Sequence, residues 1–167
     1  MKGLGTALIT PFTKEGKVDF EALGRLIEHQ VAGGTDYLVI LGTTSEVPTL
    51  SHKEQEEIVS FVVKQVAGRL PLVLGIGGNS TAAVVEKIEG WKEMLAEHFT
   101  AILSVTPYYN RPQQEGLYLH FCEIAKASPI PVILYNVPKR TGVNMLPETT
   151  RRIYDAYPEK IMGIKEA

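Results

Sequence analysis

The sequence predicts an α/β fold of repeated parallel βα units, arranged as a truncated (β/α)8 barrel (the TIM-barrel architecture) with about five and a half units. Six short apolar runs begin 29 to 35 residues apart, and helical patterns fill the gaps between them. This spacing matches the length of one βα unit. A complete barrel takes about 250 residues, whereas the chain has 167. An open, flavodoxin-like sheet is the alternative arrangement of the same elements.

The apolar runs predict strands that are buried on both faces. None of them alternates apolar with polar residues, and short continuous runs are typical of parallel sheets covered by helices. The predicted strands are Gly5–Thr10, Tyr37–Leu41, Leu72–Ile76, Ala101–Val105, Val132–Tyr135 and Ile161–Ile164. Parallel neighbours need long crossover connections, and the intervening segments are long enough to supply helices.

Two helices in the first half of the chain carry start signals. Asp19 is a candidate N-cap for an apolar stripe within residues 20–31. Ser51 and Glu54 have the spacing of a capping box, and an apolar stripe follows within residues 58–66. Each stripe predicts an amphipathic helix with one face on the sheet.

Three more helices are predicted in the second half. One apolar stripe spans Val84–Leu95 at helical spacing. It contains Gly90, which costs about 1 kcal/mol relative to alanine inside a helix. Another stripe spans Leu117–Ile124, and Pro147 begins the last. These stripes are assigned to core packing.

Composition excludes several classes of function. The 17 basic and 19 acidic residues give a formal net charge of −2 without a basic cluster, which argues against nucleic-acid binding. The single cysteine, Cys122, has no disulfide partner. No apolar run approaches the roughly 18 residues that span a bilayer, and the first residues lack a signal-peptide pattern. The four histidines lack metal-ligand spacing. We therefore expect a cytoplasmic protein with no membrane contact and no metal.

Polar and unusual residues follow the predicted strands. The carboxyl ends of parallel strands form one face of a sheet or barrel, and active sites lie on that face. The segments concerned are Gly42–Glu46, Gly75–Asn79, Thr106–Asn110, Tyr135–Gly142 and Lys165. Their convergence predicts a single site.

Lys165 is the strongest catalytic candidate. A lysine at the end of a buried strand can be desolvated, which lowers its pKa and frees the amine as a nucleophile. Its attack on a ketone gives a Schiff base, which acts as an electron sink. The alternative is a solvated lysine in a mobile terminal segment.

Other candidates lie near the same face. Tyr109 and Tyr135 can relay protons, and Thr43 can link two phenols by accepting one hydrogen bond and donating another. Backbone N–H groups at Thr43 and Thr44 can bind a carboxylate, and Arg140 offers a bidentate fork. The alternatives are tyrosines that cap the sheet edge, ordinary turns and a surface ion pair.

The Gly75–Asn79 segment has the composition of a phosphate-binding loop but lacks the GK[ST] and GxGxxG patterns. We interpret it as a turn where backbone segments approach closely. A doubly wound module that binds a phosphate at this turn is the competing hypothesis from a different functional class, and a nucleotide titration would separate the two.

Five segments together resemble the dihydrodipicolinate synthase (4-hydroxy-tetrahydrodipicolinate synthase) family, within the pyruvate-dependent class I aldolase and N-acetylneuraminate lyase superfamily. They lie in the family's order across the whole chain. They are GTALITPF at Gly5–Phe12, GTTSE at Gly42–Glu46, TPYYNRPQQEG at Thr106–Gly116, YNVPKRTG at Tyr135–Gly142 and GIKEA at Gly163–Ala167.

The resemblance implies a TIM barrel with extra C-terminal helices, assembled as a tetramer of tight dimers. It implies that pyruvate and aspartate semialdehyde condense in lysine and diaminopimelate biosynthesis, without a metal or an organic cofactor. Lys165 would form the Schiff base with pyruvate, and Tyr135 would transfer protons beside it.

The resemblance also implies roles for four further residues. Thr43 would link Tyr135 to Tyr109, which would be supplied across the tight-dimer interface. Thr44 would help to hold the pyruvate carboxylate. Arg140 would bind the carboxylate of the incoming aldehyde.

The residues depart from the family pattern at three places along the chain. Ser45 stands where the family usually has Gly or Ala, residues 98–100 differ before the fourth strand, and Ala83 replaces a Glu of lysine-sensitive members. The largest departure is length, since residues 1–167 form a single partial barrel domain without the last two βα units and the C-terminal helices. We expect the open edges of the first and last strands to pair in a homo-oligomer. We also expect a chain that is weakly active or inactive alone, or a folded scaffold without turnover.

Overall fold

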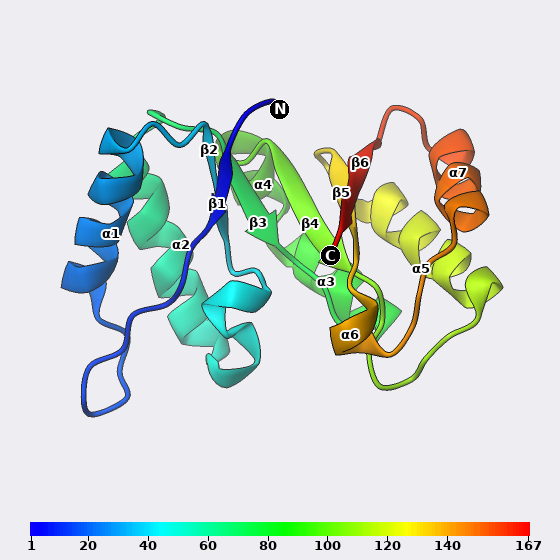
Figure 1. Ribbon diagram of the computed structural model, residues 1–167, viewed down its shortest axis with the longest axis horizontal. Coiled ribbons are helices and arrows are strands. Elements are labelled where there is room, and N and C mark those ends of the chain that lie inside the picture. Colours follow the sequence, from blue (N-terminus) through cyan, green and yellow to red (C-terminus); the bar gives the residue numbers. More distant parts are fainter. The chain divides into compact units, whose positions relative to one another are not determined.

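The computed structural model describes residues 1–167, which form two compact units, Met1–Gly75 and Ile76–Ala167. Each unit contains three strands connected by helices (Figure 1). The first unit consists of β1 (Gly5–Ala7), α1 (Phe20–Ala32), β2 (Tyr37–Ile40), the 3-10 helices η1 (Thr43–Ser45) and η2 (Val47–Thr49), α2 (His52–Val66) and β3 (Leu72–Gly75). The second consists of α3 (Thr81–Gly90), α4 (Lys92–His98), β4 (Ala101–Val105), α5 (Gln114–Ala127), β5 (Val132–Asn136), α6 (Pro138–Thr141), α7 (Pro147–Ala156) and β6 (Ile161–Glu166).

The strands of each unit are parallel and follow the order of the sequence. In the first unit β2 pairs with both β1 and β3, and in the second β5 pairs with both β4 and β6. A flavodoxin-like order would put β1 between β2 and β3. The flavodoxin-like alternative is therefore wrong, because helices connect each strand to its immediate neighbour instead of reversing the strand order.

Helices α1 and α2 begin at the residues that the sequence predicts. The Asp19 carboxylate accepts a hydrogen bond from the Ala22 N–H at 2.9 Å. Ser51 and Glu54 form the reciprocal capping box, in which the Ser51 N–H donates to Glu54 Oε2 at 2.8 Å. These contacts satisfy N–H groups that a helix leaves without partners in its first turn.

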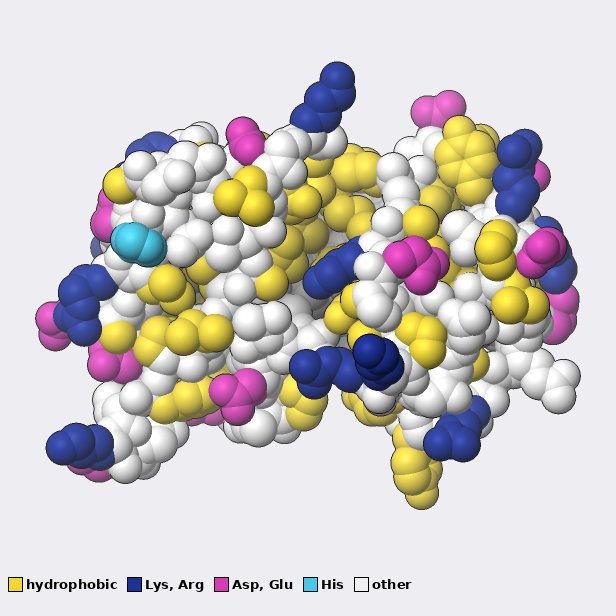
Figure 2. All heavy atoms as spheres, in the orientation of Figure 1, with side chains coloured by type: hydrophobic (Ala, Val, Ile, Leu, Met, Phe, Trp, Pro, Cys, Tyr) yellow, Lys and Arg dark blue, Asp and Glu magenta, His cyan; other side chains and the backbone are white.

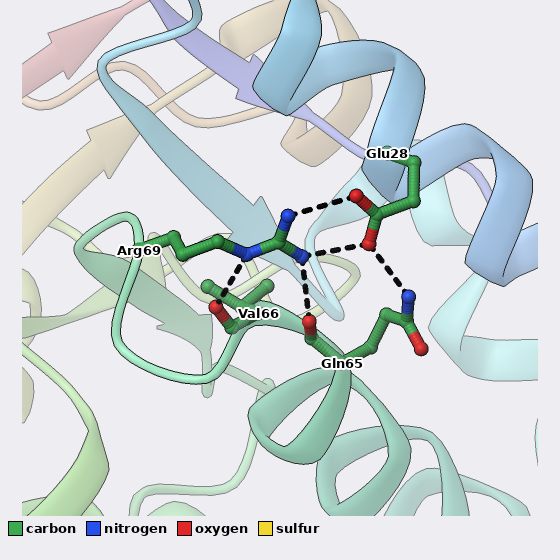
Figure 3. Close-up of polar contacts among 4 residues, drawn as sticks. All are labelled: Glu28, Gln65, Val66 and Arg69. Atoms are coloured by element: carbon green, nitrogen blue, oxygen red, sulfur yellow. Dashed lines mark hydrogen bonds and ion pairs between the residues drawn. The ribbon is translucent and has the colours of Figure 1, made fainter.

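An ion pair connects the two helices of the first unit (Figure 3). Arg69, which follows α2, donates to both carboxylate oxygens of Glu28 on α1, at 2.8 and 2.7 Å. The Gln65 amide donates to the same carboxylate at 2.6 Å. Hydrogen bonds from Arg69 and Gln65 lower the pKa of Glu28 to about 2. The bidentate geometry fixes how the end of α1 lies against the end of α2.

The predicted third helix is divided in the structure. Helix α3 ends at Gly90, Trp91 leaves helical geometry with φ −108° and ψ 14°, and α4 begins at Lys92. The apolar stripe continues across the break, since Ile88 and Leu95 are both fully buried. Gly90 has no side chain to restrict its backbone, and glycine stabilises a helix less than alanine does, so the helix is easily interrupted next to it.

A buried histidine lies in the core of the second unit. His120 on α5 is 3% exposed, and its Nδ1 lies 2.8 Å from Thr81 Oγ1 on α3. Its other ring nitrogen, Nε2, has no hydrogen-bond partner. Desolvation lowers the pKa of His120 to about 4. The imidazole is therefore neutral in the folded protein near pH 7.

No helix in the chain combines the length and the apolar character that crossing a bilayer requires.

Candidate active site

The register of β5 and β6 brings two predicted catalytic residues together. Tyr135 and Lys165 are direct partners across the parallel pair. Lys165 Nζ lies 4.5 Å from the centre of the Tyr135 ring, a cation–π contact. Tyr135 is 6% exposed, whereas the Lys165 side chain is exposed. The amine therefore lies against a buried phenol and is itself open to solvent.

The Asn136 side chain fixes the end of β6 next to this pair. Asn136 is 2% exposed, and its Nδ2 donates to Glu166 Oε2 at 2.9 Å and to Asn144 Oδ1 at 2.8 Å. Its Oδ1 accepts from the Met145 N–H at 3.0 Å. Because Glu166 directly follows Lys165, these bonds hold the backbone that carries the amine. No sequence motif marks Asn136 as functional, and its only signal is an amide at the end of an apolar run.

Replacing Asn136 with alanine is expected to lower the free energy of unfolding by about 2 kcal/mol, because a buried backbone N–H and a carboxylate lose their partner. Asn144→Ala is the matched control. It removes one of these contacts from an exposed residue and should cost less than about 1 kcal/mol. Urea denaturation of both variants would measure the difference, and equal midpoints would show that the Asn136 bonds do not stabilise β6.

Arg140 lies on the short helix α6, directly after β5. Pro138 begins this helix with a backbone suited to its first position. Gly142 ends it with φ +72°, a left-handed conformation that glycine adopts at no steric cost. The Arg140 side chain is exposed and has no ion-pair or hydrogen-bond partner. It is therefore free to bind an anion.

Tyr109 lies in an exposed turn after β4. It is 89% exposed and has φ +69°, which is uncommon for a residue with a side chain. The following Asn110 is fixed by Asn79, because Asn110 Nδ2 donates to the Asn79 carbonyl at 2.7 Å and Asn79 Nδ2 donates to Asn110 Oδ1 at 3.3 Å. The turn thus presents the phenol of Tyr109 to solvent.

Thr43 and Thr44 lie in the first unit, on the 3-10 helix η1 that follows β2. Both side chains are exposed. The next residue, Ser45, is 3% exposed and donates to the Leu8 carbonyl at 2.7 Å, while Thr10 donates to the Ser45 carbonyl at 2.8 Å. The hydroxyl of Ser45 therefore has a specific partner, and it fixes η1 against the segment that follows β1.

Gly75, the last residue of β3, and Gly77 allow backbone segments to approach closely, as the sequence suggested. A Cβ on Gly75 would lie 2.1 Å from the carbonyl oxygen of Leu41, two residues before η1. A Cβ on Gly77 would lie 2.8 Å from Val105 Cγ1. Leu41 itself has φ +50°. The absence of a side chain at Gly75 thus leaves room for the backbone that leads into Thr43 and Thr44.

The structure also shows the surroundings of Cys122 and of the residue types that bind metals. Cys122 is buried at 8% exposure, and desolvation raises the pKa of its thiol, which disfavours the nucleophilic thiolate. The structure brings together no group of three or more His, Cys, Asp or Glu side chains with the geometry of a metal site.

The chain is similar to known proteins over its whole length. The sequence profile of the Dihydrodipicolinate synthetase family matches residues 1–167. A 4-hydroxy-tetrahydrodipicolinate synthase from Parabacteroides distasonis is 55% identical over 167 residues, which are 100% of this chain and 55% of that protein. The chain thus spans about half the length of the curated relatives that it matches.

Solved structures agree with this similarity. The dihydrodipicolinate synthase from Aquifex aeolicus has a TM-score of 0.92 and 43% identity, covering 100% of this chain and 55% of that one. The chloride-inhibited dihydrodipicolinate synthase from Acinetobacter baumannii, solved in complex with pyruvate, has a TM-score of 0.92 and 41% identity, with 99% and 55% covered. This agreement confirms the predicted fold class, a parallel βα repeat that corresponds to part of a TIM barrel.

Proposed function

The chain belongs to the dihydrodipicolinate synthetase family, and we propose that it carries the pyruvate-activating residues of a synthase that condenses pyruvate with aspartate semialdehyde. The observation that supports this most directly is the alignment of Lys165 with Tyr135 across β5 and β6. Imine chemistry needs an amine and a nearby group that transfers protons, because each dehydration and enolisation step moves a proton, and a phenol can be that group. The proposal includes the predicted setting, lysine and diaminopimelate biosynthesis in the cytoplasm.

The proposed reaction begins at the amine. The unprotonated Lys165 Nζ attacks C2 of pyruvate, the resulting carbinolamine loses water, and a protonated imine remains. Loss of a proton from C3 gives an enamine, and its C3 attacks the aldehyde carbon of aspartate semialdehyde. The Tyr135 hydroxyl gives and takes the protons of these steps. The amino group that came from aspartate semialdehyde then attacks C2 and closes the ring. The bond between C2 and Nζ breaks, which releases Lys165.

The remaining candidates bind the two substrates or extend the proton relay in this proposal. Arg140 pairs with the carboxylate of the aldehyde, and its freedom from other partners supports that role. Thr44 contributes to binding the pyruvate carboxylate. Thr43 and Tyr109 extend the proton relay from Tyr135, with Tyr109 supplied by a second copy. The exposure of Tyr109 at 89% supports a phenol that acts on a neighbouring subunit.

A second candidate function is a folded scaffold without turnover. One observation favours it: the Lys165 side chain is exposed. A solvated amine lacks the desolvation that promotes nucleophilic attack. Pairing of the free strand edges in a homo-oligomer stays a prediction, as does the assignment of residues 1–167 to a single partial domain.

Borohydride trapping with pyruvate tests the proposal. The expected result is a reduced adduct on Lys165, identified by intact mass and peptide mapping. Lys165→Ala should abolish the adduct, whereas Lys64→Ala, which removes a lysine from α2, should leave it unchanged. Tyr135→Phe keeps the ring under the ammonium and removes the hydroxyl, and it should slow adduct formation about 100-fold.

Two results would count against the proposal. An adduct that persists in Lys165→Ala would contradict the assignment of the nucleophile. The absence of any adduct, from a chain with the circular dichroism of a folded α/β protein, would favour the scaffold.

A further inference from the structure

Two arginines stand apart from the others in their electrostatic surroundings. The chain has six arginines, and four of them form ion pairs with carboxylates. The exceptions are Arg111 and Arg140, and neither has an ion pair or a side-chain hydrogen bond. Both follow strands of the second unit, after β4 and β5. An uncompensated guanidinium in such a place is a candidate binding group for an anion.

Arg111 and Arg140 belong to one surface. The guanidinium of Arg111 lies directly against Gly142, since a Cβ built there would be 2.8 Å from Arg111 Nε and 3.2 Å from Cζ. Gly142 ends α6, the helix that carries Lys139 and Arg140. Figure 2 shows Lys and Arg side chains gathered where α6 lies in Figure 1. Like charges on one surface repel each other, and an anion bound between them offsets that repulsion.

The backbone holds Arg111 in place at a conformational cost. Arg111 has φ +49° and Tyr109 has φ +69°, and both are left-handed residues that carry side chains. Pro112 follows Arg111, which removes the right-handed helical conformation as an easy alternative. The Asn79–Asn110 bonds fix the residue between the two strained positions. Strain that the surrounding contacts maintain is typical of ligand-binding sites.

We infer that Arg111 is a second anion-binding residue that acts together with Arg140 on the carboxylate groups of a small dicarboxylate or of an acid such as the aldehyde substrate. The inference rests on the proposed function for the identity of the natural ligand, but not for the existence of the site. Two guanidinium groups together can hold one or two carboxylates in a fixed geometry. A single exposed arginine does not fix the geometry in this way. A side chain at position 142 would displace the Arg111 guanidinium, and the φ of +72° also favours glycine there.

Succinate is the probe that separates this site from the imine chemistry, because it has two carboxylates and no ketone. Calorimetric titration of the full chain at low salt is expected to show binding that weakens as salt is added. Arg111→Gln and Arg140→Gln should each weaken succinate binding about tenfold. Arg151→Gln is the control, because it removes the same charge from an exposed arginine of α7 and should leave binding unchanged.

A second measurement avoids any loss of fold in the variants. Phenylglyoxal modifies exposed arginines, and peptide mapping of the unaltered chain should show that succinate protects Arg111 and Arg140 but not Arg25. Equal binding by Arg111→Gln and Arg151→Gln, or no protection of Arg111, would overturn the inference. Pyruvate trapping on Lys165 reports separately on the proposed function, so each hypothesis can fail while the other stands.

Discussion

Gly75→Ala is expected to destabilise the protein by about 3 kcal/mol, the upper range for forcing an extra methyl group into a packed site. The added Cβ would lie 2.1 Å from the Leu41 carbonyl oxygen, 2.6 Å from its carbon and 2.8 Å from the Gly42 nitrogen. These are backbone atoms, so no side-chain rotation relieves the collision. Leu41 already has φ +50° and has little freedom to move.

A matched control exists in the same chain. Gly90 ends α3, has no atom within 4 Å of an added Cβ and lies outside the left-handed region. Gly90→Ala should therefore raise the free energy of unfolding by about 0.5 to 1 kcal/mol. Urea denaturation followed by circular dichroism would measure both variants. A Gly75→Ala midpoint equal to that of the unaltered chain would show that Leu41 moves aside freely.

The second large effect is a dependence of stability on pH that originates at His120. The pKa of this residue is about 4 in the folded protein because burial disfavours the imidazolium, and it is about 6.5 in an unfolded chain. Between these values the unfolded state binds a proton that the folded state does not. The free energy of unfolding should be highest above pH 6.5 and fall by about 3 kcal/mol as the pH decreases to about 4.

His120→Gln tests this assignment. Glutamine does not titrate, and its amide can still bond to Thr81. The variant should therefore lose most of the pH dependence between pH 4.5 and 6.5, a window above the range in which the lowered pKa of Glu28 contributes. His29→Gln, at an exposed position on α1, is the control and should retain the full slope. An unchanged slope in His120→Gln would show that another group controls acid stability.

The sequence predicted the strands well because each of them is a continuous apolar run. Ala101–Val105 agrees with β4 at both ends, and Pro147 begins α7 as expected. The first strand is shorter than predicted, ending at Ala7 instead of Thr10. Backbone bonding to β2 continues only to the Leu8 N–H, and Thr10 is attached through its side chain, which donates to the Ser45 carbonyl.

The candidate site was only partly predictable. A lysine and a tyrosine that follow neighbouring strands were expected to meet, and the register places Tyr135 opposite Lys165. The exposure of Lys165 depends on which strands flank β6, and local patterning carries no such information. The roles of Asn136 and Arg111 also depend on three-dimensional contacts, with Glu166 in one case and Gly142 in the other. Neither residue has a distinctive sequence pattern.

The strand order has a consequence for how the chain folds. Every strand pair joins partners about 30 residues apart, as Gly5 with Tyr37 and Ile102 with Val132 illustrate. Closing a loop of that length costs about 3 kcal/mol of chain entropy, and the cost is nearly the same for each pair. No strand pair joins residues that are much farther apart in the sequence than the others. Strand pairing can therefore begin in either unit and spread from strand to adjacent strand. Hydrogen exchange during refolding should therefore reveal protection that develops separately in residues 1–75 and 76–167.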